Sequence, residues 1–379
     1  MAAIERTTPS LEQVQGVKLD IEGNFPLDEA VVEALQPDLK IISANYHGSS
    51  AWSVTGSIDA KTSDGSPMSF FVKYTTEETG REQLEGEYRG MLEIYNSVTG
   101  LAPKPYGHGK LKHASQPTYF FVCEFVDFIR DALPDPAKLG ARLAELHQSS
   151  VSPTGKFGFS VPTYDGKLPQ VTDWDSSWST FFGRLLAGIA RLDTATNGPW
   201  TELDTAVECT VTSVVPRLLG ALECGGRTIK PCLIHGDLWE GNIGTECETG
   251  NIYIFDGAPY YAHNEMELGI WRTEHHRMKN KAYKREYLQH LEPSEPRDEF
   301  DDRNRLYSVK TQLMYSAHVR GTNVRNQAYE NLKYLIEKYA SSPHEETGDS
   351  NIVSEAEKDL GNRSGKFQLL RDSLEHLTI

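Results

Sequence analysis

The residues of this chain that could do chemistry are concentrated in a short stretch after residue 234. Asp237 is followed five residues later by Asn242, and Asp256 comes directly after the apolar run 252–255. A carboxylate, an amide at this spacing and a second carboxylate in a glycine-containing turn form the pattern that phosphoryl transfer to a hydroxyl uses. The pattern therefore predicts a small-molecule-type kinase rather than a polar hairpin with incidental acidic residues.

Each of the three side chains has a distinct expected role. Asp237 would accept or orient the proton of the substrate hydroxyl, for which an ordinary low pKa is adequate. Asn242 and Asp256 would supply a neutral and an anionic oxygen to Mg²⁺, a hard cation with octahedral geometry. Because nucleotide phosphates can complete the coordination, we expect ATP and Mg²⁺ as the cofactors.

A phosphate group also needs a cation, and the candidate is Lys73, at the end of the apolar segment 69–74. Burying an ammonium group without a partner is costly, so an acid on the following helix is expected to orient it. We expect that acid to be Glu87, with Glu85 as the alternative. The two side chains project about 160–200° apart on a helix, so at most one of them faces inward.

The segment 45–52 is expected to cover the phosphates, with Gly48, Ser49 and Ser50 as the contact residues. Backbone amides and two hydroxyls can cradle phosphate oxygens. The segment has a single glycine, so the alternative of an ordinary hairpin turn stays open. Glu124 and its neighbours are expected to link two lobes and to present backbone groups to adenine, a role that needs no particular side chain.

Three further features carry weaker signals. Trp239 lies between the expected base and the expected metal ligand, where its indole could stack on a sugar or pack under the loop. His147 ends a helical pattern and fits a structural hydrogen bond better than catalysis. Five basic residues between positions 277 and 285 fit a solvated helix face better than a binding patch.

Composition narrows the class of protein. The chain has 379 residues, which exceeds the usual size of a single core, so two lobes are expected. Its net charge of −16 argues against a nucleic-acid partner, which would require an excess of Lys and Arg. Five cysteines without metal-ligand spacing indicate a reducing compartment. The sequence has neither a signal peptide nor an apolar run of about 20 residues, so we expect a cytoplasmic protein without a membrane partner.

The elements that must position these residues change in character along the chain. Strands and hairpins come first, then one helix and a further strand, and then mostly helices. Asp135-Pro136 is a helix-starting pair. The expected strands are 41–58 with a turn inside, 69–74, 119–125, and a short pair formed by 231–235 and 251–256; the expected helices are 82–97, a helix from 136, 173–192, 205–222, 276–291 and 301–341.

This order predicts an α+β chain with a small β-rich N-lobe and a larger α-helical C-lobe. The N-lobe, residues 40–126, would bind the nucleotide. The C-lobe, residues 127–379, would carry the catalytic and substrate-binding groups, with residues 342–365 as a loop or a poorly ordered segment. An N-terminal extension, residues 1–39, with a helix over 27–35, has no assignable role.

Beyond these patterns, the sequence resembles the fructosamine-3-kinase and protein-ribulosamine-3-kinase family, in a form common among fungal members. That family is akin to aminoglycoside phosphotransferases and choline kinases. The resemblance extends from about residue 40 to 341, and the tryptophan of the first matching segment separates the family from its relatives. The segments that carry it are 235–242, 156–159, 169–174 with Trp178 and 181–182, 255–256, 263–268 and 301–307.

The resemblance implies a bilobal protein-kinase-like fold of the aminoglycoside phosphotransferase type. It also implies ATP-dependent phosphorylation of the sugar 3-hydroxyl of ketoamine adducts on lysine, either glycated proteins or small glycated amines. The phosphorylated adduct then breaks down and frees the amine, which amounts to deglycation and protein repair. Carried over by position, Trp239, Asp173 and Trp174 would contact the substrate, and the roles given above to the other residues are unchanged.

Two departures from the family pattern and two alternatives belong to this interpretation. The phosphate segment reads His47-Gly48-Ser49-Ser50 without the cysteine often found there, so redox control through that loop is not expected. Gly257 stands where the family usually has proline. The alternatives are a kinase for another small alcohol, such as an aminoglycoside or choline, and a nucleotide-binding pseudokinase that acts as a scaffold.

Overall fold

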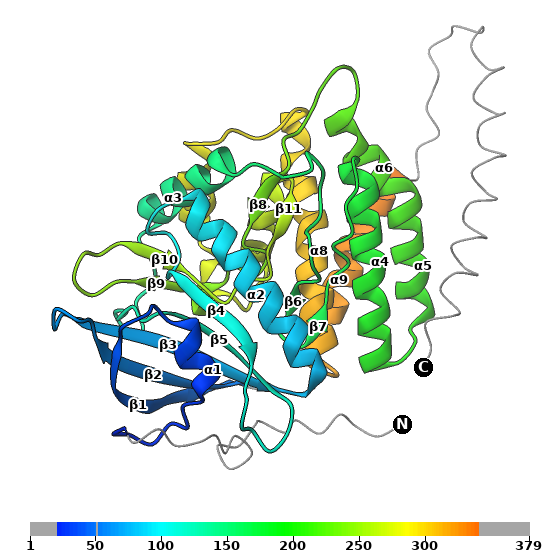
Figure 1. The fold of residues 1–379 in the computed structure, drawn as a ribbon. Helices are drawn as coiled ribbons and strands as arrows, with labels where there is room; N and C mark the ends of the chain where they lie inside the picture. The colour runs from blue at the N-terminus through cyan, green and yellow to red at the C-terminus, as the bar shows by residue number, and fades with distance from the viewer. Residues whose placement is uncertain (1–20, 51, 341–379) are drawn as a thin grey trace, which may run out of the picture. The chain divides into compact units, whose positions relative to one another are not determined.

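A computed structural model describes residues 21–50 and 52–340. Its N-terminal part is an antiparallel sheet of five strands in the order β1-β2-β3-β5-β4 (Figure 1). Buried residues alternate along β2, as expected of a strand with one face turned to a core, whereas β5 is buried on both faces. The elements are β1 (Lys40–Ser49), β2 (Val54–Lys61), β3 (Pro67–Thr76), α2 (Glu77–Ser97), β4 (Pro105–Lys110) and β5 (Thr118–Glu124).

The segment before residue 40 covers one face of this sheet. It forms α1 (Glu29–Ala34), whose N-terminus is capped by Asp28. Leu27 and Val31 are buried in the same apolar cluster as Phe70 and Val72 of β3. The expected helix in this segment is therefore confirmed, and the segment contributes to the core of the sheet instead of standing outside it.

The phosphate segment differs from the expected turn. Strand β1 continues through Ser49, so that Gly48 pairs with Thr55 of β2. The turn between the two strands lies at residues 50–53. Two consequences follow: the hydroxyl of Ser50 is at the turn, and Gly48 and Ser49 belong to the strand that leads into it.

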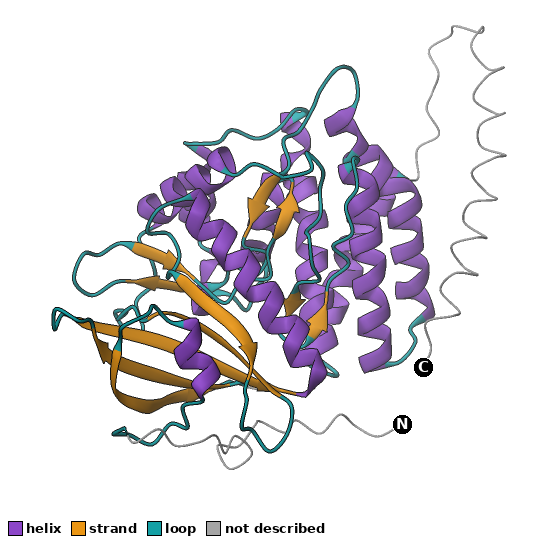
Figure 2. Cartoon of the chain, in the orientation of Figure 1, coloured by secondary structure: helices purple, strands orange, loops and turns teal. Residues whose placement is uncertain are grey.

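The part of the chain after β5 is mainly helical, as expected (Figure 2). Its apolar cluster gathers side chains from nearly all of these helices, together with the C-terminal half of α2. Asp135 caps the first helix by accepting a hydrogen bond from the amide of Lys138, which confirms the expected start. The helices are α3 (Pro136–Ser149), α4 (Trp178–Asn197), α5 (Thr201–Cys209), α6 (Val215–Leu218), α7 (Lys281–Leu288), α8 (Phe300–His318) and α9 (Val324–Tyr339).

Several of the expected helices have different bounds: 82–97 begins at residue 77, and 276–291 is reduced to α7. The segment 173–177 is not helical, because Asp175 exchanges backbone hydrogen bonds with Phe157 and Ser177 caps α4. The expected helix 301–341 is two helices, since the chain turns between α8 and α9 at Gly321, where φ is +75°. The expected loop at 342–365 lies outside the described residues.

The segments 231–235 and 251–256 contain short strands, but these strands do not pair with each other, so the expected strand pair is wrong. β8 (Cys232–Ile234) pairs with β11 (Tyr260–Ala262), and β9 (Ile243–Thr245) pairs with β10 (Ile252–Ile254). The strand before Asp237 and the strand before Asp256 are therefore each held by a different partner strand. A third small pair, β6 (Tyr164–Asp165) with β7 (Leu168–Pro169), completes the strands of this region.

The sheet and the helical part meet along α2, which packs closely on segments that follow residue 160. A Cβ atom on Gly86 would lie 2.5 Å from the carbonyl oxygen of Pro162, and one on Gly90 would lie 2.0 Å from Cγ of Pro259. These two glycines are four residues apart and so share one side of the helix. We propose that the chain divides into a sheet lobe and a helical lobe near residue 126, with α2 as the main contact.

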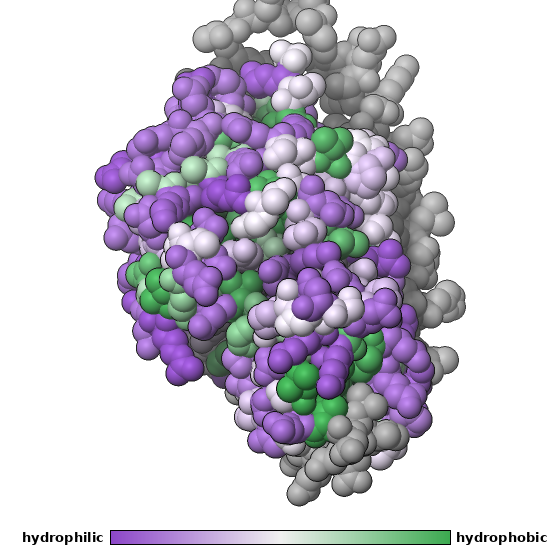
Figure 3. All heavy atoms as spheres, turned by 60° about the vertical axis from the view of Figure 1, so that its left-hand side comes forward, coloured by the Kyte–Doolittle hydropathy of each residue, from purple (hydrophilic) through white to green (hydrophobic). Residues whose placement is uncertain are grey.

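Polar residues dominate the face shown in Figure 3, where hydrophobic side chains form only small groups. Within residues 21–50 and 52–340, none of the helices combines the length and the hydropathy needed to cross a membrane.

Replacing Gly90 with Ala should lower the free energy of unfolding by about 1–3 kcal/mol, because the added methyl group overlaps Pro259. The matched control is Gly183→Ala in α4, where the nearest atom to the new Cβ is 3.5 Å away. That variant should gain about 0.4–1 kcal/mol, since alanine favours a helix. Urea unfolding of both variants tests this; an equal effect at the two positions would contradict the packing of α2 described above.

Candidate active site

Two adjoining cavities lie where the sheet lobe meets the helical lobe. The sheet cavity, of about 400 Å³, is lined by β1, β3, β5 and the residues after β5. The loop cavity, of about 480 Å³, is lined by the segments around Asp165 and Asp237 and by the end of α8. The two cavities share the residues Ser50, Ser53, Lys73, Glu87 and Asp256.

Lys73 on β3 lies at the junction of the cavities and binds two carboxylates. Its Nζ is 2.8 and 3.0 Å from the carboxylate oxygens of Glu87 on α2, and it also contacts Asp256. Burial would lower the pKa of Lys73, but the charges of Asp256 and Glu87 outweigh burial and raise it. Glu85 instead faces outward and pairs with Arg89, so the structure brings together the expected pair, Lys73 and Glu87.

The two carboxylates share this single ammonium group, and the cluster therefore has an excess of negative charge. Burial raises the pKa of Glu87 to about 7 despite its attraction to Lys73, and the charge of Asp256 adds to the rise. For Asp256, the attraction to Lys73 overcomes the effect of burial and lowers the pKa. About half of the Asp256 side chain is exposed to the cavity. A cation beside Asp256 would balance this cluster.

Asp256 has a left-handed backbone conformation, with φ at +59°. Asp tolerates this conformation better than most residues, and its occurrence in a non-glycine residue is concentrated at functional sites. The preceding strand β10 ends at Ile254, so the turn aims the carboxylate into the cavity beside Lys73.

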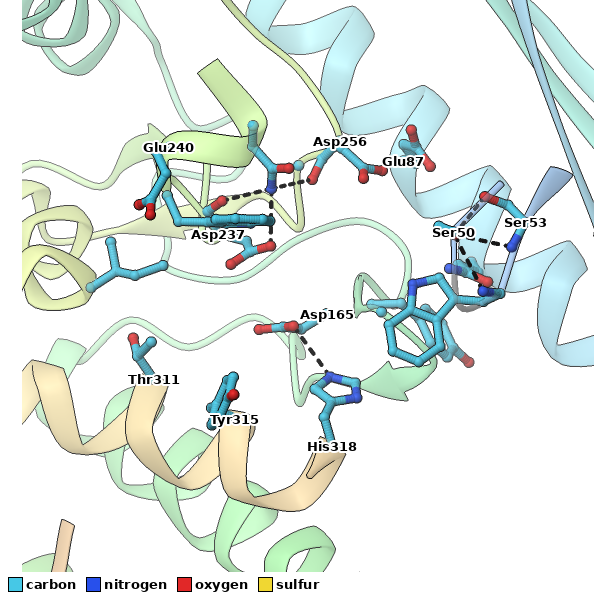
Figure 4. Close-up of a pocket in the computed structure, with 18 of the residues that line it drawn as sticks. Ser50, Ser53, Glu87, Asp165, Asp237, Glu240, Asp256, Thr311, Tyr315 and His318 are labelled. Atoms are coloured by element: carbon cyan, nitrogen blue, oxygen red, sulfur yellow. Dashed lines mark hydrogen bonds and ion pairs between the residues drawn. The ribbon is translucent and has the colours of Figure 1, made fainter. Parts of the chain in front are cut away.

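Asn242 connects Asp237 to Asp256. Its side-chain nitrogen donates to the backbone oxygen of Asp237 at 2.9 Å, to Oδ2 of Asp237 at 3.0 Å and to the backbone oxygen of Asp256 at 3.2 Å. With the nitrogen used in this way, the side-chain oxygen is the atom left to face a cation. The structure therefore brings together all three residues of the Asp-Asn-Asp pattern (Figure 4).

A buried carboxylate holds the turn that carries Asp237. Glu267 accepts hydrogen bonds from the amides of His235 and Gly236, at 2.5 and 3.1 Å. Its other neighbour is His147, whose Nε2 lies 3.7 Å from the Glu267 carboxylate and whose Nδ1 bonds Tyr287 at 2.8 Å. His147 is buried and touches neither cavity, as expected of a structural residue.

The ring of His235 holds the turn that carries Asp256. Its Nε2 lies 2.9 Å from the carbonyl oxygen of Phe255, the residue before Asp256. Burial lowers the pKa of His235, so the ring is neutral and can donate to this carbonyl. The turns of Asp237 and Asp256 are thus joined through one imidazole.

Asp237 lies in a field of opposing charges. Burial, followed by the charge of Asp165, raises the pKa of Asp237 well above that of an ordinary aspartate, while Lys310 acts in the opposite direction. Lys310 is on α8, and its Nζ lies 3.3 Å from the carbonyl oxygen of Gly236.

Trp239 lines the loop cavity next to Asp237 and remains one-third exposed. Its ring centre lies 5.9 Å from that of His276, and it covers Gly241, where a Cβ atom would lie 2.2 Å from the indole. The indole both packs over the turn of the motif and presents a face to the cavity.

The residues expected around the nucleotide line the sheet cavity. Gly48, Ser49, Ser50 and Glu124 all belong to its wall. The hydroxyl of Ser50 accepts hydrogen bonds from two amides of its own turn, those of Trp52 and Ser53. The carboxylate of Glu124 accepts a hydrogen bond from the amide of Lys104. Any contact of Glu124 with a nucleotide would therefore come from its backbone.

Two of the expected substrate residues lie elsewhere. Trp174 packs against Tyr261 with ring centres 6.0 Å apart, and Asp173 is exposed with its carbonyl bonded to Arg184. Neither residue lines either cavity. We therefore leave Asp173 and Trp174 out of the site.

The sequence patterns missed the wall of the loop cavity opposite Asp237. This wall combines the β6–β7 hairpin with one side of α8, which are separated by about 150 residues in the chain. No short motif contains them, so no signal in the sequence points to them. The missed wall residues are Asp165, His275, His276, Thr311, Tyr315 and His318, and Lys310 pairs with Asp165 from outside the lining.

Comparison with known proteins settles the family. The family model described as fructosamine kinase matches residues 43–338, which is most of the chain. The chain belongs to the fructosamine kinase family. Its fold agrees with this membership, because the solved structure of a candidate fructosamine-3-kinase from Thermobifida fusca superposes with a TM-score of 0.61 at 19% identity. That match covers 81% of this chain and 98% of the other.

The curated relatives of this family member include proteins of plants, an animal and bacteria. A protein-ribulosamine 3-kinase of rice, named chloroplastic, is 34% identical over 53% of this chain and 55% of its own length. A ketosamine-3-kinase of mouse is 31% identical over 53% of this chain and 68% of its own length. The chain thus spans about half the length of the plant relatives it matches.

An aminoglycoside phosphotransferase, solved with AMP-PNP and hygromycin B, has the same fold. It superposes with a TM-score of 0.51 at 13% identity, over 84% of this chain and 99% of its own. The expected bilobal protein-kinase-like α+β fold is therefore confirmed.

Replacing Glu267 with Gln should lower the free energy of unfolding by about 1–3 kcal/mol, because the side-chain nitrogen of Gln is a donor and would face one of the two backbone N–H groups. The matched control is Glu93→Gln, which still accepts from the hydroxyl of Tyr261 and should change stability by less than about 0.5 kcal/mol. Urea unfolding at neutral pH measures both.

The loss of stability in Glu267→Gln should depend on pH. Burial would raise the pKa of Glu267, but contacts with His147 and His235 lower it below the usual value. The stability that this carboxylate provides is therefore present above about pH 4.3 and is lost as the pH falls further. The deficit of Glu267→Gln should shrink in that acidic range; a constant deficit would contradict the role of the charge.

Proposed function

We propose that this protein is an ATP-dependent kinase that phosphorylates the 3-hydroxyl of ketoamine adducts on lysine, with ribulosamine favoured over fructosamine. The observation that carries the proposal is the meeting of Asp237, Asn242 and Asp256 beside the Lys73–Glu87 pair, at the junction of two cavities. Membership of the fructosamine kinase family supports the choice of substrate. Family membership does not favour the alternatives, another small-alcohol kinase or a scaffold.

The nucleotide would occupy the sheet cavity. Aromatic and apolar side chains such as Phe71, Phe121 and Met91 form much of its wall, as a purine requires. Its phosphates would reach Lys73, which is already oriented by Glu87. The hydroxyls of Ser50 and Ser53, which line both cavities, would lie beside them.

Magnesium fits the oxygens present at the junction. Asn242 offers an amide oxygen and Asp256 a carboxylate, the kinds of ligand that this cation prefers. Across the described residues, no cluster of three or more His, Cys, Asp or Glu side chains is arranged to hold a metal on its own. The remaining ligands would therefore be phosphate oxygens and water. When bound, the ion would neutralise charge on the transferred phosphoryl group.

The acceptor would enter the loop cavity. Asp237 would orient the 3-hydroxyl and take its proton, because it is the carboxylate that Asn242 holds at the junction. Trp239 would contact the sugar with the exposed face of its indole. Spontaneous breakdown of the phosphorylated adduct would then free the lysine amine, so the partners would be glycated proteins or small glycated amines.

We propose a cytoplasmic location, although the plant relatives are named chloroplastic. All five cysteines are free, which supports a reducing compartment.

The first test is release of ADP from ATP and Mg²⁺ with ribulose-lysine, fructose-lysine and unmodified lysine as acceptors. We expect turnover with the ketoamines alone and a higher rate with ribulose-lysine. Asp237→Ala should reduce turnover by at least about a hundredfold, as loss of a general base does, while the affinity for an ATP analogue stays within about threefold. The proposal would be overturned if no ADP were released with any of the three acceptors, or if the turnover of the variant equalled that of the wild type.

Replacing Trp239 with Ala should raise KM for the ketoamine by about tenfold and leave KM for ATP nearly unchanged. The physical reason is that the indole lines the loop cavity and not the sheet cavity. Steady-state kinetics with each substrate varied in turn provides the measurement. Equal changes in both constants would show that the indole only packs over Gly241.

A further inference from the structure

The wall opposite Asp237 contains an ionised carboxylate that the proposed reaction does not use. Asp165 ends strand β6, and 16% of its side chain is exposed, toward the loop cavity. Its Oδ1 lies 3.3 Å from Nε2 of His318, and its Oδ2 lies 3.8 Å from Nζ of Lys310. Burial would raise the pKa of Asp165, but these two partners lower it, so the group is negatively charged.

The other acidic groups of the loop cavity have different surroundings. Glu87 and Asp256 bind Lys73. Glu240 accepts from the amide of Arg277 at 3.0 Å, and its Oε2, which has no hydrogen-bond partner, faces His276 at 3.6 Å. Setting aside the base itself, Asp165 and Glu240 are the carboxylates of this cavity that Lys73 does not hold, and Asp165 is the one that faces Asp237 (Figure 4).

Lys310 pairs with Asp165 from outside the cavity lining. Its side chain is 2% exposed and does not line the cavity, and its Nζ also lies 3.3 Å from the carbonyl oxygen of Gly236. It thus connects the hairpin of Asp165 to the turn of Asp237. The lysine keeps Asp165 charged and leaves its cavity side open to a second cation.

Two aromatic rings lie next to the residue that follows Asp165. The ring centre of Trp52, from the turn of the sheet lobe, lies 5.3 Å from that of His318. This approach depends on Gly166, where a Cβ atom would lie 2.8 Å from His318 and 2.9 Å from Trp52. A carboxylate bordered by aromatic faces suits an alkylammonium ion, whose charge meets the acid while its carbon chain lies on the rings.

The arrangement of the two carboxylates suits a ketoamine. Its amine nitrogen and its 3-oxygen are four bonds apart, which limits their separation to about 5 Å. The carboxylates of Asp165 and Asp237 face each other across one opening (Figure 4) and line the same cavity. A ketoamine whose hydroxyl lies at Asp237 would therefore have its amine on the side of Asp165.

We propose that Asp165 binds the protonated secondary amine of the acceptor and thereby selects ketoamines over neutral sugars, an inference that rests on the proposed function. His318 and Lys310 are positioning residues that orient this carboxylate. Trp52 covers the alkyl chain that leads away from the amine.

The test compares two acceptors with the same sugar: an N-alkyl ribulosamine, and the ether in which oxygen replaces the amine nitrogen. Wild type should prefer the amine in kcat/KM by at least about tenfold, since the ether lacks the charge-assisted hydrogen bond. In Asp165→Asn, kcat/KM for the amine should fall by at least about tenfold, while kcat/KM for the ether stays within about threefold. The preference should then nearly disappear.

Two controls make the outcome decisive. Glu240→Gln removes a charge from the same cavity and should keep the preference for the amine; loss of the preference in that variant instead of Asp165→Asn would overturn the proposal. Asp173→Asn, outside both cavities, should change neither value. Equal losses for amine and ether in Asp165→Asn would show a structural role.

The wild type alone also tests the idea, whether or not the variant folds. Equal turnover of amine and ether would refute the role of Asp165 while leaving the kinase assignment intact. Turnover of neither compound would refute the proposed function and this inference together.

Discussion

The interaction on which the rest of the site depends is the contact of one ammonium group, that of Lys73, with two carboxylates from different parts of the chain. Glu87 comes from α2 and Asp256 from the turn after β10. An unpaired buried charge is costly, so these three elements are stable only when they meet. The sheet, the long helix and the catalytic turn are thereby brought to one point, where the two cavities join.

A second buried charge fixes the other half of the site. Glu267 holds the backbone of the turn before Asp237, and His235 passes this restraint to the residue before Asp256. Two turns separated by 19 residues in the chain are thus oriented as a unit. The close packing of α2 on Pro162 and Pro259 works in the same direction, because it leaves the helix that carries Glu87 little room to move.

The acceptor side is organised differently from the nucleotide side. There, residues from the sheet turn, the β6–β7 hairpin and α8 converge without any shared motif. Their charges alternate: Asp237 faces Asp165, with Lys310 behind both. In the proposed reaction, such an arrangement would let the substrate preference vary through a few wall residues while the chemistry of the junction stays constant.

The sequence by itself predicted that Asp237, Asn242 and Asp256 act together, because their spacing reflects local turns whose geometry is set over a few residues. It also predicted the main strands and helices in their order, since periodicity is a local property, while the short strands β4 and β11 lay outside every expected element.

Only the tertiary structure decided which strands pair. β8 and β10 were expected to join each other, yet β8 pairs with the distant β11, whereas β10 pairs with its neighbour β9. The same holds for the wall that contains Asp165 and His318, and for Asp173 and Trp174, which line neither cavity. The reason is that packing makes a cavity wall, and packing leaves no fixed spacing in a sequence.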